Sequence, residues 1–231
     1  MVLKIGGFEE LSLTDYPGKV SSVVFLLNCN FRCKYCYNVD LLSEANFAKS
    51  SRKLYNMTKV LDYLTDHKKM LEGVVISGGE PCLDSSLIDF IMRIKAIGLL
   101  VKLDTNGSNP DLLKTLLDNN MIDYVAMDIK APFDKYKAIC GYGGVNKIKR
   151  SIGLLKKSIV PHEFRTVVWP RFNKKDFKSI SKLIVGEKWF LQPLQQSKGM
   201  LEEALIIKNF SRRDINDIVK SLGSGCKVVV R

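Results

Sequence analysis

The sequence predicts an α/β fold, a partial TIM-like (β/α)6 barrel of parallel strands that is open laterally. Short apolar, strand-like runs alternate with amphipathic, helix-like segments, and this alternation is typical of a parallel sheet with helical crossovers. At 231 residues the chain has the length of one α/β domain with a substantial core. Six βα units are fewer than the eight of a closed barrel. We therefore expect a gap in the wall, and a single domain over residues 1–231.

The predicted elements follow one another in a regular order. The strand-like runs cover residues 21–27, 73–77, 99–104, 123–128, 164–169 and 188–192. The helix-like segments cover residues 58–71, 85–97, 110–120, 145–158, 176–185 and 211–222. Outside these segments, residues 6–19 indicate a short hairpin or capping strand, and residues 39–52 indicate a loop with weak helical content.

Start and stop signals support this division. Asp84 and Asn109 stand just before two of the helices, where a side-chain oxygen can accept the first free backbone N–H groups. Pro110 suits the first helical position, because the N–H group that proline lacks has no partner there. Gly98 and Gly186 stand where helices are expected to end, since glycine readily takes the left-handed conformation of a helix terminus.

The formal net charge of +12 raises the question of a nucleic acid partner, because clustered lysines and arginines release counterions from phosphates. The basic residues are, however, spread along the chain. The densest sets, residues 147–150 and 156–157, recur among apolar residues at helical spacing, as on the solvated face of one helix. We therefore do not expect a nucleic acid partner, and an acidic protein partner fits the charge at least as well.

The composition indicates a cytoplasmic protein without a membrane partner. No apolar run is long enough to span a bilayer, and residues 1–7 lack the apolar core of a signal peptide. The six cysteines show no disulfide-like framework, which agrees with a reducing compartment.

Three cysteines follow the first strand-like run closely: Cys29, Cys33 and Cys36. Three thiolates at this spacing can hold three corners of a cubane iron–sulfur cluster, whereas closed clusters and structural zinc sites usually take four protein ligands. The fourth iron is then open to a small molecule. A zinc or redox-thiol site is the alternative, but the sequence offers no obvious fourth ligand pair. The scattered thiols are expected to be buried apolar groups or incidental: Cys82, Cys140 and Cys226.

Polar and glycine-rich motifs follow the next three strands. Gly78-Gly79-Glu80 comes after the second strand, the segment 104–107 (DTNG) after the third, and the segment 128–130 (DIK) after the fourth. In parallel α/β folds the loops at the carboxyl ends of the strands converge on one end of the sheet. The sequence therefore predicts a cofactor site at that end, shared with the cysteines.

The cysteine triplet resembles the hallmark of the radical S-adenosylmethionine enzymes. The resemblance extends to residues 77–81, 104–107 and 127–130, and to the N-terminal runs 6–10 and 13–18. Together these segments are similar to the glycyl-radical-enzyme activases, in the branch of the anaerobic ribonucleoside-triphosphate reductase activating proteins. Pyruvate formate-lyase activating enzymes are near relatives of that branch. The similarity covers nearly the whole chain.

The resemblance implies a 4Fe–4S cluster on the three cysteines and a bound S-adenosylmethionine. Backbone carbonyls of Gly78 and Gly79 would accept from its ammonium group, and Glu80 would orient that group by charge. Asp128 and Lys130 would face its ribose and carboxylate. Alternatives remain for each: a tight turn for the glycines, a helix cap for Glu80, and a plain ion pair for Asp128 and Lys130.

Further contacts are implied on the other side of the cofactor. Tyr35 would lie against the cluster and the adenine, with ordinary packing as the alternative. Tyr37 and Asn38 would contact the adenine, largely through the backbone. Arg165 points inward on the fifth predicted strand, where a buried arginine needs an anionic partner, and we assign it to the cofactor carboxylate or to a peptide carbonyl.

A monovalent cation near the cofactor is a further implication. Asp104, Thr105 and Asp128 match the oxygen donors that hold such an ion in some of these enzymes. The alternative is simple turn chemistry, because the Asn-Gly pair within the DTNG segment favours left-handed backbone conformations.

The implied reaction is reductive cleavage of S-adenosylmethionine, followed by hydrogen abstraction from a glycine of a partner protein. The branch that the chain resembles implies anaerobic ribonucleotide reductase as this partner. The electron would come from an external flavodoxin or ferredoxin-type donor, since the chain lacks the additional cysteine clusters of some activases. Gln192 and Gln195 occupy the region where relatives acting on pyruvate formate-lyase can place a histidine, so the exact partner stays open. The alternatives are a radical enzyme on a small molecule, such as a 7-carboxy-7-deazaguanine synthase-like enzyme, and a non-catalytic iron–sulfur electron carrier or RNA-binding protein.

Overall fold

The computed structural model describes residues 3–195 and 209–230 of the chain. In these ranges eight strands form one sheet, and each strand lies beside its neighbours in the sequence. The strands are β1 (Ile5–Ser12), β2 (Ser21–Leu26), β3 (Gly73–Gly78), β4 (Leu100–Thr105), β5 (Tyr124–Asp128), β6 (His162–Val168), β7 (Lys188–Pro193) and β8 (Lys227–Val230). β1 is antiparallel to β2, and all later pairs are parallel. Because β1 and β8 are the two edges of the sheet, the barrel is open, as predicted.

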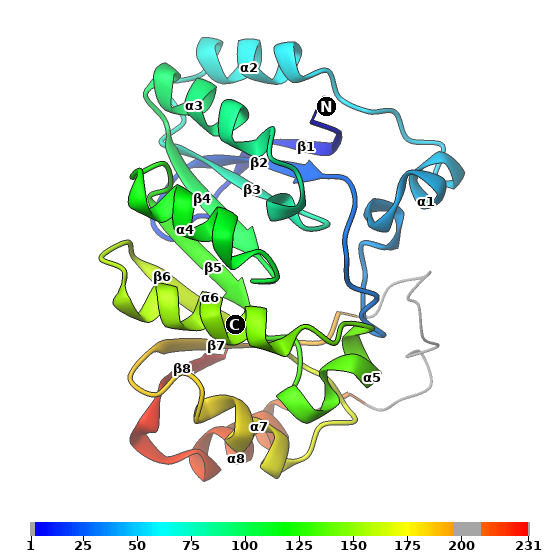
Figure 1. Cartoon of the computed structure of the whole chain (residues 1–231), viewed down its shortest axis with the longest axis vertical. Coiled ribbons are helices and arrows are strands. Elements are labelled where there is room, and N and C mark those ends of the chain that lie inside the picture. The colour runs from blue at the N-terminus through cyan, green and yellow to red at the C-terminus, as the bar shows by residue number, and fades with distance from the viewer. Residues whose placement is uncertain (1–2, 196–208, 231) are drawn as a thin grey trace.

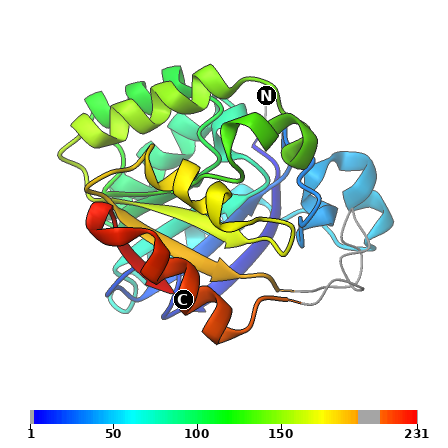
Figure 2. The same ribbon diagram turned by 90° about the horizontal axis from the view of Figure 1, so that it is seen from below.

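Helices link the parallel strands. They are α1 (Glu44–Lys49), α2 (Met57–Asp66), α3 (Leu87–Ile97), α4 (Pro110–Asp118), α5 (Tyr136–Cys140), α6 (Val145–Lys157), α7 (Lys174–Ser181) and α8 (Arg212–Ser221), with short 3-10 turns η1 (Val39–Leu42), η2 (Pro81–Leu83), η3 (Phe133–Lys135) and η5 (Gly223–Gly225). The crossover helices cover the outer face of the curved sheet, while α1 and α5 lie at one end of the strands (Figure 1, Figure 2). Within the described ranges, no helix combines the length and the apolarity needed to cross a membrane.

Apolar side chains at helical spacing fix the helices on the sheet. In α3 the buried positions are Leu87, Phe90, Ile91 and Ile94, which share one face of a helix. They belong to the same core as Val74 and Ile76 of β3, which are fully buried. Gly98 ends α3 with a φ of 97°, a conformation that glycine reaches without the steric cost of a Cβ atom.

All six predicted strands and all six predicted helices are present, with their ends displaced by a few residues. The segment 6–19 contributes β1, which is the antiparallel edge strand. The segment 39–52 is more helical than expected, because it forms η1 and α1, and the Ser43 side chain caps α1 by accepting the Asn46 N–H at 3.2 Å. Neither α5 nor β8 was predicted from the sequence.

The prediction that Asp84 caps the helix after Pro81 is wrong. Residues from Pro81 form the short turn η2, and α3 begins only after Ser86, which holds the N-cap position. Asp84 instead accepts the backbone N–H of Ser86 at 2.9 Å and so stabilises the turn between η2 and α3. In contrast, Asn109 caps α4 as expected, accepting the Leu112 N–H at 3.2 Å.

Candidate functional site

A cavity of about 210 Å³ lies at the carboxyl ends of the parallel strands. Every residue that the sequence analysis assigns to the site lines it: Cys29, Cys33, Tyr35, Cys36, Tyr37, Asn38, Gly78, Gly79, Glu80, Asp104, Thr105, Asp128, Lys130 and Arg165. Thirteen of these residues lie at the carboxyl ends of β2, β3, β4 and β5 or in the loops that follow them. The fourteenth, Arg165, lies on β6. The predicted convergence of the four motifs at one end of the sheet is thus present in the structure.

The cysteine loop, residues 29–36, follows β2 and is held by neighbouring loops. The Arg32 N–H donates to the Cys140 carbonyl at 2.7 Å, and the Lys34 N–H donates to the Ile139 carbonyl at 3.0 Å. Both bonds tie the loop to the end of α5. All six cysteines of the chain are free thiols, so the structure contains no disulfide that would occupy the triplet.

Burial suppresses ionisation of the three thiols. Burial raises the pKa of Cys29 to about 12 and also raises the pKa of Cys36. A hydrogen bond with the Cys140 thiol, together with burial, raises the pKa of Cys33 well above its usual range. The ammonium of Lys130 lowers the pKa of each of the three thiols and opposes these effects. Binding of a metal centre would therefore release protons from this loop.

The arrangement of donors fits a cluster better than a single ion. Among the residues that the structure describes, no three histidine, cysteine or carboxylate side chains converge closely enough to hold one metal ion. A cubane cluster has no such requirement, because each thiolate binds a different iron. Three thiols on one loop beside a cavity can each bind a different iron of a cluster, whereas a tetrahedral zinc ion needs all its ligands around one point.

The Gly78-Gly79 pair allows β3 to approach the chain that leads into the cysteine loop. Gly78 has a φ of 112°, and a Cβ atom there would lie 2.4 Å from the Leu26 backbone nitrogen. At Gly79 a Cβ atom would lie 2.1 Å from the Asn28 carbonyl oxygen. Any larger residue would push the two strand ends apart, so the pair has a packing role as well as its place on the cavity wall.

Glu80 is buried and its carboxylate joins two of the motif loops. It accepts the Cys82 N–H at 3.0 Å, which caps η2. It also accepts the Thr105 hydroxyl at 2.7 Å and the Asn106 N–H at 2.6 Å. Burial raises the pKa of Glu80 while these hydrogen bonds lower it. The cap that the sequence analysis held as the alternative is therefore one function of this side chain.

Replacing Glu80 by glutamine should destabilise the protein even in the absence of any ligand. The amide nitrogen of the variant must face a buried donor, either the Asn106 N–H or the pair formed by Cys82 and Thr105. Leaving such a donor unsatisfied costs about 2 kcal/mol of unfolding free energy. Urea denaturation measures this loss, and Glu44→Gln, whose exposed carboxylate pairs with Lys4, should stay within about 0.5 kcal/mol of the wild type. Equal stability of the two variants would contradict the joining role of Glu80.

A buried ion network occupies the centre of the cavity wall. Arg165 bridges two carboxylates, with its NH1 group 3.0 Å from Asp104 Oδ2 and its Nε 2.9 Å from Asp128 Oδ1. The pairing follows from strand register, because Asp128 of β5 lies opposite Arg165 of β6. Lys130 Nζ lies 2.8 Å from Asp128 Oδ2, and Lys102 pairs with Asp104. Three cations face two carboxylates, which leaves one positive charge in excess.

Several of the predicted residues find partners within the chain. The anionic partner expected for Arg165 is supplied by Asp104 and Asp128, and the ion pair held as the alternative for Asp128 and Lys130 is present. The Thr105 hydroxyl donates to Glu80 and accepts the Gly107 N–H at 3.0 Å. The guanidinium group of Arg165 therefore lies between the carboxylates of Asp104 and Asp128.

The network should make stability fall at acidic pH. Burial opposes ionisation of Asp128, but the charges of Arg165 and Lys130 outweigh it and lower the pKa of this carboxyl to about 2. A folded-state pKa below the unfolded value means that the contribution is complete above about pH 4 and is lost as the pH falls towards 2. The loss is about 2 kcal/mol. Urea denaturation between pH 5 and pH 2.5 should show it, with a shallower dependence for Asp128→Asn; identical slopes for both proteins would contradict this account.

The aromatic side of the cavity is formed by the end of the cysteine loop. Tyr35 is buried, its hydroxyl donates to the Lys130 carbonyl, and its ring lies 5.4 Å from that of Trp169. It therefore packs and lines the cavity at once. Tyr37 is 56% exposed, and burial of its remaining surface raises the pKa of its hydroxyl. Asn38, which is half-buried, precedes η1.

Two structural partners of the site escaped the sequence analysis. Lys102 is buried on β4 and pairs with Asp104; its signal was its position two residues before that aspartate, on the same face of the strand. Asn106 donates from its side chain to Asn30 Oδ1 at 3.0 Å, and Asn30 donates to Ser108 at 2.9 Å. The DTNG loop thus holds the cysteine loop on one side and Glu80 on the other.

Comparison with known proteins identifies the family of the chain. The model of the Radical SAM superfamily matches residues 23–184. A provisionally named glycyl-radical enzyme activating enzyme of Methanocaldococcus jannaschii is 38% identical over 187 residues, which make up 78% of this chain and 75% of that protein. A pyruvate formate-lyase-activating enzyme of Clostridium pasteurianum is 33% identical over 142 residues, which make up 61% of this chain and 58% of that enzyme.

The fold is also found in a solved structure. Streptococcus suis SuiB bound to S-adenosylmethionine matches 89% of this chain and 48% of its own length, with a TM-score of 0.61 and 13% sequence identity. At this identity the match concerns the fold alone. The family match, which includes the cysteine loop and three of the motif loops, goes further. The chain belongs to the Radical SAM superfamily, whose enzymes use a 4Fe–4S cluster and S-adenosylmethionine.

Proposed function

We propose that this protein is a cytosolic glycyl-radical-enzyme activase, that residues 1–231 act as one radical SAM domain, and that its partner is anaerobic ribonucleotide reductase. The observation that carries the proposal is the shared cavity, whose wall holds the thiols of Cys29, Cys33 and Cys36 beside the glycine pair and the ion network. Similarity to an activating enzyme over 78% of the chain supports the same activity.

The residues of the cavity fit both cofactors. Cys29, Cys33 and Cys36 would hold three irons of the cluster. The excess positive charge of the ion network favours an anionic group, so Lys130 and Arg165 would bind the carboxylate of S-adenosylmethionine.

The remaining contacts follow the walls of the cavity. The carbonyls of Gly78 and Gly79 would accept from the ammonium group, and Asp128 would bind the ribose. The loop residues Tyr35, Tyr37 and Asn38 would enclose the adenine. A monovalent cation would bind near Asp104, Thr105 and Asp128.

A bound, reduced cluster would supply the electron for cleavage of S-adenosylmethionine into methionine and a 5′-deoxyadenosyl radical, and this radical would take a hydrogen atom from a glycine Cα of the partner. The chain itself orients the reactants and keeps competing hydrogen donors away. Val23, Phe25 and Val167 supply apolar lining, without readily abstracted O–H or S–H hydrogens. Similarity to an activating enzyme over 78% of the chain favours a glycine of a partner protein over a small-molecule substrate.

Electron paramagnetic resonance tests the proposal. The anaerobically reconstituted protein is incubated with S-adenosylmethionine, a reductant and anaerobic ribonucleotide reductase, and pyruvate formate-lyase is tested in parallel. We expect 5′-deoxyadenosine and an organic radical on the reductase, and no radical on a reductase whose radical-bearing glycine is replaced by alanine. A radical on pyruvate formate-lyase alone would overturn the partner. Cleavage of S-adenosylmethionine with no radical on either protein would overturn the activase function.

A further inference from the structure

Although basic residues occur along the whole chain, the net positive charge is concentrated in one stretch of the fold. Residues 130–182 contain fourteen lysines and arginines but three acidic residues, so they account for +11 of the formal charge of +12. This stretch runs from the end of β5 through α5 and α6 to α7 (Figure 1). The rest of the chain is close to neutral. Such an asymmetry creates a field over one side of the molecule rather than a uniformly basic surface.

Direct contacts join this basic stretch to the cysteine loop. The Arg32 N–H donates to the carbonyl of Cys140, the last residue of α5, at 2.7 Å. Directly before α5, Lys135 of η3 forms an ion pair of 2.7 Å with Asp176 in the first turn of α7. The cysteine loop, α5 and the start of α7 therefore form one connected surface beside the three thiols.

Cations line that surface, which we call the basic rim: Arg32, Lys34, Lys137, Lys174 and Lys175. Four of them are exposed, and Lys34 is half-buried. Asp134 is an exposed acidic neighbour on η3, whereas Asp176 is paired with Lys135. No rim residue is among those that line the S-adenosylmethionine cavity. The rim thus lies outside the cavity, and two of its residues, Arg32 and Lys34, belong to the cysteine loop itself.

Helix stability does not explain the two lysines at the start of α7. The N-terminus of a helix carries partial positive charge, so cations in its first turn are unfavourable. The cap of α7 is supplied instead by Asn173 and Asp176, whose side chains bond to each other's backbone N–H groups. Lys174 and Lys175 therefore oppose the local preference, which points to an interaction outside the helix.

We infer that the basic rim is the docking surface of an acidic one-electron carrier protein that reduces the cluster from the outer side of the cysteine loop. This inference rests on the proposed function, because each turnover consumes one electron and the sequence has no second cluster motif to store it. In the transfer the carrier loses one electron and the cluster gains it. Opposite charges raise the rate of productive encounters, and Arg32 stands between two cluster ligands in the sequence.

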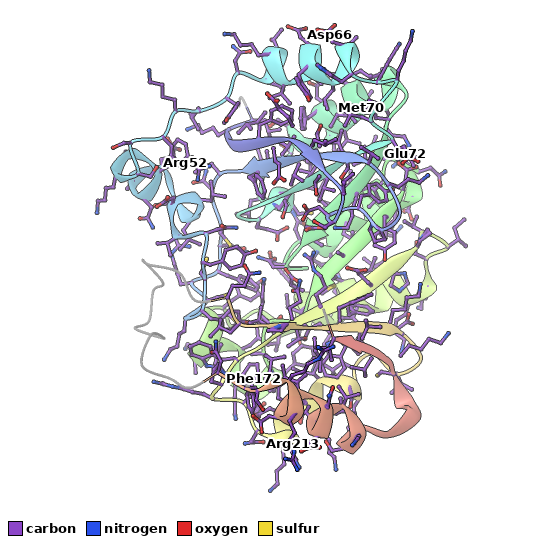
Figure 3. All side chains as sticks on the ribbon, turned by 180° about the vertical axis from the view of Figure 1, so that it is seen from behind. Arg52, Asp66, Met70, Glu72, Phe172 and Arg213 are labelled. Atoms are coloured by element: carbon purple, nitrogen blue, oxygen red, sulfur yellow. The ribbon has the colours of Figure 1, made fainter. Side chains whose placement is uncertain are left out.

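The test measures cluster reduction, not radical formation. The rim variant is the holoenzyme that carries both Lys137→Glu and Lys174→Glu. The control variant carries both Lys68→Glu and Lys69→Glu, which make the same change of charge at two exposed lysines next to Met70. Met70 lies at the opposite end of the molecule from Phe172, which precedes α7 (Figure 3). Stopped-flow absorbance follows reduction by an acidic flavodoxin hydroquinone at low and high salt. Photoreduced 5-deazariboflavin, a small reductant, serves as the second electron source.

We expect the rim variant to be reduced by flavodoxin at least about tenfold more slowly than wild type at low salt, with a weaker salt dependence. The control variant should match wild type within about twofold, and deazariboflavin should reduce all three proteins equally. Equal flavodoxin rates for the rim and control variants would overturn the inference. Equal slowing of the rim variant by both reductants would overturn it as well. Cluster reduction is measured without a protein partner. The reduction rates therefore test the docking surface even if the protein does not activate a glycyl-radical enzyme.

Discussion

Cys33→Ala is expected to abolish the iron–sulfur cluster and, with it, the cleavage of S-adenosylmethionine. A cubane cluster held by three thiolates has no protein ligand in reserve. The loss should exceed the roughly 10- to 100-fold that follows from changing a residue behind a metal ligand. Iron and acid-labile sulfide analysis after anaerobic reconstitution, together with the electron paramagnetic resonance signal of the reduced cluster, measures it directly.

Cys140→Ala provides a matched control for this experiment. Cys140 is fully buried beside Cys33 and shares a hydrogen bond with it, so both variants remove a thiol from the same region. We expect Cys140→Ala to keep its cluster. Loss of the cluster in both variants would identify Cys140 as a fourth ligand and remove the open iron on which radical chemistry depends. A stable, active cluster in Cys33→Ala would refute the assignment of Cys33.

The parts of the site that the sequence predicted are those that parallel strands impose. Cys29, Gly78 and Asp104 each follow or end a strand-like run, and parallel strands bring such positions to one end of the sheet regardless of loop detail. The structure places all of them on one cavity. The glycines were informative for a similar reason, since a positive φ at Gly78 and close backbone contact at Gly79 allow few other residues.

The parts that the sequence did not predict depend on long-range contacts or on very short elements. α5 has five residues and β8 has four, too few to show a period. β8 exists because its backbone pairs with β7, which no local pattern reveals. The partners of Glu80 lie on the next strand's loop. Likewise, the carboxylates that pair with Arg165 lie on two other strands. The sequence therefore indicated that Arg165 needs an anionic partner, but not which residues supply it.

Arg165→Leu is expected to cause the largest loss of stability among changes that leave the cysteines intact. The arginine side chain is 12% exposed and bridges two largely buried carboxylates. Removing one partner of a buried ion pair leaves uncompensated charge and costs about 3–5 kcal/mol. That is a large share of the roughly 5–15 kcal/mol that stabilises a typical domain. Chemical denaturation at pH 7 measures the change, and weaker binding of S-adenosylmethionine to the folded fraction should accompany it.

An exposed arginine provides a control that separates the loss of a buried ion pair from the loss of any positive charge. Arg150 pairs with Asp111 at 2.7 Å, but both side chains are more than half exposed, so Arg150→Leu should cost less than about 1 kcal/mol. A double variant sharpens the test further. If Asp128→Asn is added to Arg165→Leu, the combined loss should be smaller than the sum of the two single losses, because the second change removes a charge that the first left unpaired. Strict additivity would show that the two residues do not stabilise each other, and the ion network would then lose its place as the element that holds the cavity wall together.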